Sequence, residues 1–255
     1  MIEKLKENQF LFEELVKRDF KKKYKRTALG MFWSMLSPLL SLLVMALVFT
    51  QFFGRDTPHY IIYLFSGNIV MSFFRESTKS GMVCLMTNAN IFSKINVPKY
   101  LFLFSKNVSA LINFGLTIII YLIFVAVDGI HFHFGFLLLL FPVVCLTVMD
   151  IGIGMILSAL YVFFRDTEYL YDVFLTLLTY LSAVFYNIDR FSVNIQRCFL
   201  ANPVYVYIKY FRTIVIDGVV PSLAYHGLCI AYSLLFLGIG CWVYKHYNRK
   251  FIYYV

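Results

Sequence analysis

The chain has 255 residues, of which 60% are hydrophobic and only 15% are charged, with a mean hydropathy of +0.74. This composition argues against a water-soluble fold, because globular domains carry about 25% charged residues. The net charge is +9, but 28 Phe and 19 Tyr in long uncharged runs argue against a basic nucleic-acid-binding domain. We therefore interpret the positive charge as the mark of a membrane surface.

The first predicted element is a cytoplasmic amphipathic helix within residues 1–28. Apolar side chains recur there at helical spacing, beside ladders of Lys and Arg. The apolar stripe consists of Phe12, Leu15, Val16, Phe20 and Tyr24. We expect this stripe to lie in lipid, with the cations directed toward anionic head groups. A plain anchor that only orients the chain is the competing interpretation.

Six apolar runs predict an all-α integral membrane protein, with the whole chain forming one transmembrane domain. In the clearest run, 28 residues without a charge separate Arg26 from Arg55, and about 20 apolar residues suffice to cross a bilayer. The second and fifth runs are short, so Arg75, Lys79 and Tyr169 are expected to snorkel toward the interface. The expected spans are about 29–53, 59–83, 101–127, 134–164, 168–187 and 219–244.

The distribution of Lys and Arg predicts the orientation of these spans. With six spans, 18 basic residues fall on the side of both termini and five on the other side. Short cytoplasmic loops carry the excess of basic residues, so both termini should be cytoplasmic in a multi-pass protein of a bacterial plasma membrane. A cleaved signal peptide is not expected, because the first apolar run begins late and is longer than a signal sequence requires.

The segment 189–217 is amphipathic and is interrupted by Asn202-Pro203. It fits neither a span nor a soluble loop, and we expect re-entrant external helices between spans five and six that cap or line a pathway. An interfacial hairpin with no transport role is the alternative.

Motifs for ATP hydrolysis and metal binding are missing from the sequence. There is no GxxxxGK[ST] phosphate loop and no Gly-Lys pair, so this chain cannot hydrolyse ATP by that route. The five cysteines lack metal-ligand spacing, and the pair His131 and His133 has no further ligands nearby. We expect no metal site and no cofactor on this chain.

Four short motifs occur in order along the chain: LVKRDFKKKYKRTALGMFW over 15–33 with Ser37-Pro38; NANIFSK over 88–94 with Pro98-Lys99; Phe163-Phe164-Arg165-Asp166; and Asn202-Pro203 with Tyr210-Phe211-Arg212. Together they resemble the permease subunit of ABC exporters for O-antigen, capsule and teichoic acid polymers. The sequence departs from the family pattern at Arg26-Thr27 and over 182–186, which leaves the identity of the polymer open.

The resemblance implies an exporter powered by a separate nucleotide-binding subunit. Two copies of that subunit would be present, and they would hold ATP and Mg. The implied substrate of the exporter is a polymer carried on undecaprenyl pyrophosphate. Six helices are too small a bundle to enclose a sugar chain, so we expect a second copy of the chain related by a twofold axis. Membrane lipids are further partners, and nucleic acid is not.

Three groups of candidate site residues follow from the motifs. Cations are expected at the lipid pyrophosphate, although the same cluster would also set topology; they are Lys22, Lys23, Lys25, Arg26, Arg75 and Lys79. Aromatic side chains that could stack on sugars in a channel are Phe32, Trp33, Phe73, Phe74, Phe185 and Tyr186. The expected contacts to the ATPase are Asn88, Ala89, Asn90, Ile91, Phe92, Ser93, Lys94, Arg165 and Asp166.

Two other functions remain open from the residues alone. One is an exporter of the same broad fold for a lipid or a drug. The other is a membrane enzyme or an ion-coupled carrier, but only Asp150 lies near the middle of a span, so a proton relay lacks partners. We expect Asp150 to face the bundle and to make a structural hydrogen bond rather than to act in transport.

Overall fold

The computed structural model describes residues 8–24, 30, 32–53, 58–92, 94, 97–189, 191–247 and 250–254. All regular secondary structure in these residues is helical, which confirms the prediction of an all-α protein. The helices are α2 (Gln9–Tyr24), α3 (Phe32–Phe53), α4 (Tyr60–Met82), α5 (Cys84–Thr87), α6 (Ala89–Phe92), α7 (Tyr100–Val127), the 3₁₀ helix η2 (Phe134–Leu139), α8 (Leu140–Phe163), α9 (Thr167–Leu181), α10 (Val193–Phe199), α11 (Pro203–Val215), α12 (Leu223–Tyr247) and α13 (Phe251–Tyr254).

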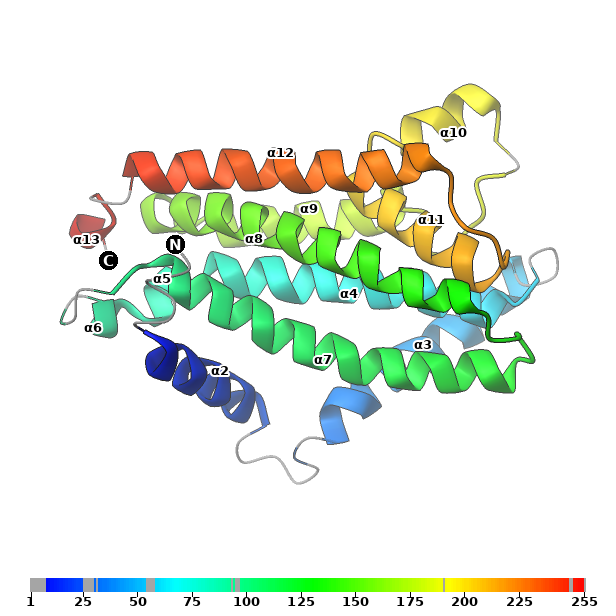
Figure 1. Ribbon diagram of the computed structural model, residues 1–255, viewed down its shortest axis with the longest axis horizontal. Helices are drawn as coiled ribbons and strands as arrows, with labels where there is room; N and C mark the ends of the chain where they lie inside the picture. Colours follow the sequence, from blue (N-terminus) through cyan, green and yellow to red (C-terminus); the bar gives the residue numbers. More distant parts are fainter. Residues whose placement is uncertain are drawn as a thin grey trace.

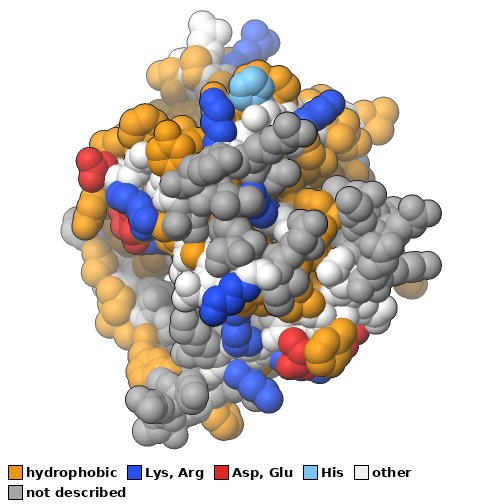
Figure 2. Space-filling view, turned by 90° about the vertical axis from the view of Figure 1, so that its left-hand side faces the viewer, with side chains coloured by type: hydrophobic (Ala, Val, Ile, Leu, Met, Phe, Trp, Pro, Cys, Tyr) orange, Lys and Arg blue, Asp and Glu red, His pale blue; other side chains and the backbone are white. Residues whose placement is uncertain are grey.

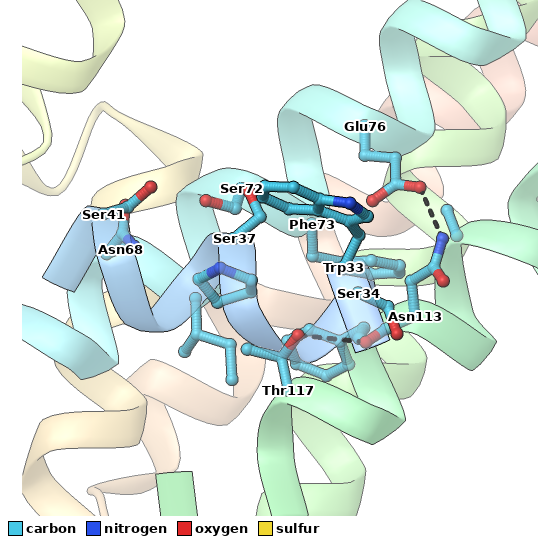
Figure 3. Close-up of a pocket in the computed structure, with 14 residues that line it drawn as sticks. Trp33, Ser34, Ser37, Ser41, Asn68, Ser72, Phe73, Glu76, Asn113 and Thr117 are labelled. Carbon is cyan, nitrogen blue, oxygen red and sulfur yellow. Dashed lines mark hydrogen bonds between the residues drawn. The ribbon is translucent and has the colours of Figure 1, made fainter. Parts of the chain in front are cut away.

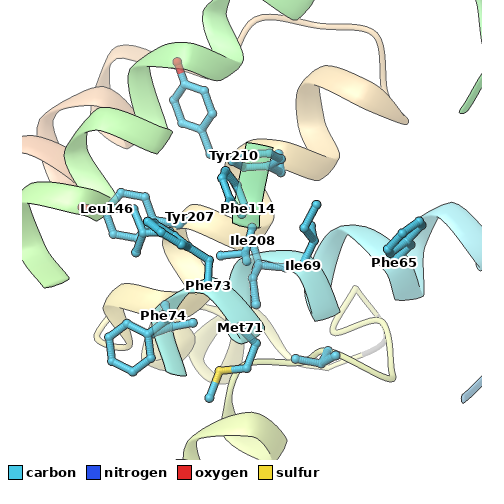
Figure 4. Packing of buried hydrophobic residues seen from close by; sticks show 14 of the residues in the cluster. Phe65, Ile69, Met71, Phe73, Phe74, Phe114, Leu146, Tyr207, Ile208 and Tyr210 are labelled. Carbon is cyan, nitrogen blue, oxygen red and sulfur yellow. The ribbon is translucent and has the colours of Figure 1, made fainter. Parts of the chain in front are cut away.

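The long helices run alongside one another in an elongated bundle (Figure 1). Helix α8 packs against both α12 and α4, and α4 also packs against α7, so α4 and α8 form the centre. Helices α2, α5, α6 and α13 lie at one end of the bundle, whereas α10 and α11 lie at the other. Apolar side chains from α4, α7, α8 and α11 meet in the buried core (Figure 4).

Four of the helices among the described residues are long and apolar enough to cross a membrane. They are Phe32–Gln51, Tyr100–Val127, Phe134–Phe163 and Leu223–Tyr247. Helix α9 has only 15 residues, fewer than the roughly 20 that span a bilayer. Helix α4 has 23 residues, but polar and charged side chains lower its apolarity. The count of six spans therefore stays a prediction.

Helix α2 differs from the expected lipid-embedded helix. Leu15 is 2% exposed and packs in a cluster with Leu85 and Phe102, and Leu11 and Phe12 pack against the same cluster. The expectation that this stripe faces lipid is wrong at Leu15, because α7 offers it a protein surface instead.

Helices α8 and α12 approach unusually closely at two glycines. A Cβ atom at Gly152 would lie 2.4 Å from the backbone nitrogen of Leu237, and one at Gly240 would lie 2.5 Å from the Gly152 carbonyl oxygen. Small residues permit such backbone contact between membrane helices. Asp150, one half-turn earlier, is fully buried and so faces the bundle as expected. Neither carboxyl oxygen has a hydrogen-bond partner among the described residues, so the predicted structural hydrogen bond is absent.

At the other end, Asn202 separates α10 from α11. Its side-chain oxygen accepts a hydrogen bond from the backbone nitrogen of Val204 at 3.0 Å and caps α11. Its side-chain nitrogen donates to the Leu181 carbonyl at 3.1 Å and to the Ser182 hydroxyl at 2.9 Å. The interrupted helix pair is present as expected, and its depth in the membrane stays a prediction.

Candidate functional site

A groove lined by both polar and apolar side chains lies between α3, α4 and α7 (Figure 3). Its first part is a cavity of about 540 Å³ and its second part, toward α9, a cavity of about 600 Å³. The two cavities share four lining residues, so they form one continuous surface; the shared residues are Ser41, Asn68, Ser72 and Glu76.

Polar side chains at helical spacing build this groove. Helix α3 contributes Ser34, Ser37 and Ser41, and α7 contributes Asn113 and Thr117. These intervals of three and four residues place each set on one helix face. Both sets occur inside strongly apolar helices. The candidate channel residues chosen from the sequence were aromatic, so these hydroxyl and amide side chains were not predicted.

Helix α4 supplies the third wall of the groove. Asn68, Ser72 and Glu76 follow one another at intervals of four residues. The Asn113 side-chain nitrogen donates to the Glu76 carboxylate at 2.7 Å, which joins α7 to α4 across the groove. An amide donor toward a carboxylate is one of the stronger hydrogen bonds in proteins.

The six predicted channel aromatics separate into two sets. Trp33 and Phe73 line the groove, where Phe73 packs on Phe114 with ring centres 4.6 Å apart. The other four lie outside the lining of the groove. Phe32 is 72% exposed on α3 and Phe74 is buried in the core.

Phe185 and Tyr186 stabilise the loop after α9. Phe185 stacks on Phe49 with ring centres 4.6 Å apart, and its carbonyl accepts a hydrogen bond from the Tyr60 hydroxyl at 2.7 Å. The Tyr186 hydroxyl donates to the Tyr180 carbonyl at 2.8 Å. Both side chains therefore have structural contacts within the chain.

Two of the six predicted phosphate-binding cations line the second part of the groove. The Lys79 ammonium forms an ion pair with Asp172 at 2.6 and 2.8 Å, and Arg75 donates to the Thr179 hydroxyl at 3.1 Å. Both contacts are to α9, and both cations are at least partly exposed. Lys22 and Lys23 lie on α2 with side chains outside the described set, and Lys25 and Arg26 lie outside the described residues altogether.

The predicted ATPase-contacting segment, 88–94, contains the short helix α6 and follows directly on α5, at the end of the bundle that also carries α2 (Figure 1). Its first residue, Asn88, is buried and so is not an exposed contact as expected. Within it, Asn90 is exposed, Ala89 and Ile91 pack partly against the cluster around Leu85, and Lys94 is exposed. The Phe92 side chain and the whole of Ser93 lie outside the described set.

Other charged residues at this end differ in their exposure. Arg165 and Asp166 are exposed at the turn between α8 and α9, with the Arg165 guanidinium 5.6 Å from the centre of the Tyr161 ring. Lys99 is largely buried, with its ammonium 5.4 Å from the centre of the Phe251 ring, and burial lowers the pKa of Lys99. Lys and Arg side chains are spread across this end of the molecule (Figure 2).

Comparison with known proteins places the chain in a family. The family described as ABC-2 type transporter matches residues 11–216. An O-antigen export system permease protein RfbA of Klebsiella pneumoniae is 26% identical over 233 residues, covering 89% of this chain and 88% of that protein. Another from Klebsiella pneumoniae is 25% identical and covers 95% of each. One from Myxococcus xanthus is 28% identical and covers 73% of this chain and 72% of that protein.

These findings confirm the resemblance carried by the four sequence motifs. The family match includes α2, the groove, the α5–α6 segment and α11. Since it covers most of the chain, the protein belongs to the ABC-2 type transporter family and is a multi-pass membrane component of an ABC transporter, not its ATP-hydrolysing part.

Proposed function

We propose that this chain is the membrane-spanning subunit of an ATP-driven exporter that moves a lipid-linked polysaccharide out of the cytoplasm through a homodimeric channel. The similarity to O-antigen permeases supports the choice of substrate class. Both termini are cytoplasmic in this proposal, with six crossings.

The observation that carries the proposal is the set of exposed polar side chains in the groove. Ser37 and Ser41 are exposed on the strongly apolar helix α3, and Ser72 and Arg75 are exposed on α4. Hydrocarbon cannot satisfy their hydrogen-bonding groups, so such residues face a water-filled pathway or another protein surface. Hydroxyl and amide groups in a wetted groove match the hydroxyl-rich surface of a sugar chain.

A second copy would close this groove. Helix α3 is the least covered of the four apolar spans, with 11% of its most apolar window buried. A twofold axis along the membrane normal would bring two such faces together and enclose one pathway between them. The same arrangement would present two α5–α6 segments to two ATP-binding subunits.

The cations have a place in the same scheme. Arg75 and Lys79 lie on α4 toward the end of the bundle that carries α2, where a pyrophosphate head group would enter from the cytoplasm. Because Asp172 already pairs with Lys79, binding of a phosphate would have to displace that carboxylate.

Bulky substitutions along α3 test the proposal. The host cells lack their own permease and carry the ATPase that works with this chain. In these cells Ser41→Trp should abolish surface display of an undecaprenyl-pyrophosphate-linked polysaccharide, because the indole fills the groove. Leu43→Trp is the matched control on the same helix, since Leu43 is 53% exposed and does not line the groove. Export by Ser41→Trp at the level of Leu43→Trp, with equal amounts in the membrane, would refute the groove as the pathway.

A further inference from the structure

A charge cluster around the buried carboxylate of Asp19 joins three segments that lie far apart in the sequence. The Asp19 carboxylate, on a side chain 3% exposed, pairs with the Arg18 guanidinium at 2.9 Å and with the Lys106 ammonium at 3.0 Å. Arg18 also donates to the Asn88 side-chain oxygen at 2.8 Å. The Ser105 hydroxyl lies 3.5 Å from the second Asp19 oxygen.

The cluster forms a continuous connection from α7 to the α5–α6 segment. Lys106 belongs to α7, Arg18 and Asp19 to α2, and Asn88 to the turn between α5 and α6. Asn88 is 1% exposed, and its side-chain nitrogen donates to the Cys84 carbonyl at 2.8 Å, which fixes it to α5. Helix α2 is therefore the middle element of the connection.

Anchoring of α2 by apolar packing does not require this arrangement. Asp19 lies one turn after Leu15 on the face of α2 that packs against α7, where an apolar residue would suffice. A buried carboxylate is costly unless it is paired and hydrogen-bonded, and its partners then fix one relative position of the elements. Here the fixed elements are the surface helix, the segment proposed to contact the ATPase, and a wall of the groove.

We infer that Arg18 and Asp19 are positioning residues for coupling: they hold α2, the α5–α6 segment and the start of α7 as one mechanical unit during ATP-driven transport. This inference rests on the proposed function, because it assumes that the α5–α6 segment receives the motion of an ATPase. Asn113 lies about two turns beyond Lys106 on α7. A displacement of α5–α6 thus reaches the groove through a bonded path rather than through loosely packed loops.

Distance measurements between α2 and α6 test the unit directly. Spin labels are placed on the exposed positions Lys17→Cys and Asn90→Cys, with the exposed Cys198 and Cys241 replaced by Ser. In the reconstituted complex with its ATPase, we expect one narrow distance distribution that is the same with and without ATP and vanadate. The Arg18→Gln variant should broaden or shift it in the presence of nucleotide.

The matched control is Glu13→Gln, which removes a charge from the exposed face of α2, where Glu13 accepts a hydrogen bond from Gln9 and lies outside the Asp19 cluster. It should leave the distribution unchanged. Arg18→Gln should also fold, because its side chain is 42% exposed, and a thermal melt checks this. The inference would be overturned if the distance distribution between the two labels were unchanged in Arg18→Gln. It would also be overturned if that distance changed with nucleotide in the protein that keeps Arg18 and Asp19.

A functional readout separates positioning from simple stability. Arg18→Gln and Asp19→Asn should keep ATP hydrolysis but lower the polymer exported per ATP by about threefold or more, the scale at which residues along a coupling path act. The double variant should be no worse than the poorer single variant, because the two residues act in one network. Additive losses, or an unchanged export per ATP, would contradict the proposal.

Failure of the proposed function and failure of the inference about Arg18 and Asp19 would give different results. If the unsubstituted complex hydrolyses ATP but exports no polysaccharide, the proposed substrate is wrong, and the distance measurement still decides whether α2 and α6 move together. If the unsubstituted complex exports and both variants keep its coupling, only the inference about Arg18 and Asp19 is wrong.

Discussion

Arg212 provides the most quantitative test of how the α10–α11 end of the bundle is held together. Its side chain is 4% exposed and donates to the carbonyl oxygens of Ala183, Val184 and Tyr63 at 2.9, 3.0 and 3.0 Å. The guanidinium carbon also lies 3.4 Å from the centre of the Tyr63 ring. Among the described residues no carboxylate pairs with it, so neutral acceptors and one ring face stabilise the charge.

Substitution of Arg212 should therefore be unusually costly. A hydrogen bond from a charged donor contributes about 1.5–3 kcal/mol, and a buried acceptor left unpaired costs about 1–3 kcal/mol. These terms are not additive, and water can enter part of the space, so we expect Arg212→Gln to lose about 3–5 kcal/mol of stability. For a chain of this size that corresponds to a fall of roughly 10 °C in Tm.

The assay is the thermal midpoint of the purified protein in detergent, followed by size-exclusion chromatography after heating. Arg197→Gln is the matched control, because Arg197 is an exposed cation on α10. Arg212→Lys should lose about half as much as Arg212→Gln, since one ammonium keeps the charge but cannot reproduce the planar fork of donors. If Arg212→Gln melts within about 2 °C of Arg197→Gln, the guanidinium network does not stabilise this end as argued.

Three further predictions concern glycine packing, the buried carboxyl and topology. Gly152→Ala should cost about 1–3 kcal/mol or more by forcing α8 from α12, seen as a lower thermal midpoint, whereas Gly115→Ala, with open space around its Cβ, should be neutral or slightly stabilising. Asp150→Asn should fold and export like the parent, because neither carboxyl oxygen meets hydrogen-bond geometry with a partner in the described part of the chain; loss of export in a well-folded Asn variant would instead indicate a transport role. In intact cells, an impermeant thiol reagent should modify exposed Cys198 but not a cysteine at Lys94, and the reverse pattern would invert the topology.

The sequence predicted the helical class well because the controlling physics is local. A run of about 20 apolar residues in a membrane has no alternative to helix, since each backbone group must be paired within the segment. The 28 uncharged residues before Arg55 are enough for this conclusion. The break at Asn202-Pro203 was equally readable, because Pro cannot continue a helix and Asn caps the next one.

The partners of individual side chains were not readable in the same way. The apolar stripe of α2 satisfies both a lipid surface and a groove beside α7, and its composition does not discriminate between them. Asp19 carried the missing information, because a carboxylate on an apolar stripe predicts a protein partner rather than lipid. The carbonyl oxygens that accept hydrogen bonds from Arg212 belong to a loop more than twenty residues earlier and to α4. No rule of residue spacing predicts a contact between such distant segments.

Helix α4 shows how a departure from the pattern of a membrane span can itself locate function. It fails the apolarity of a lipid-facing span because polar residues recur every fourth position, at Asn68, Ser72, Glu76 and Ser80. An interval of four residues keeps these side chains on one side of α4. Three further polar residues of the helix, Ser66, Ser77 and Thr78, are buried and make their hydrogen bonds within the chain. The stripe therefore differs from them in lining the groove, and the serines of α3 at similar intervals line the same groove from the other side.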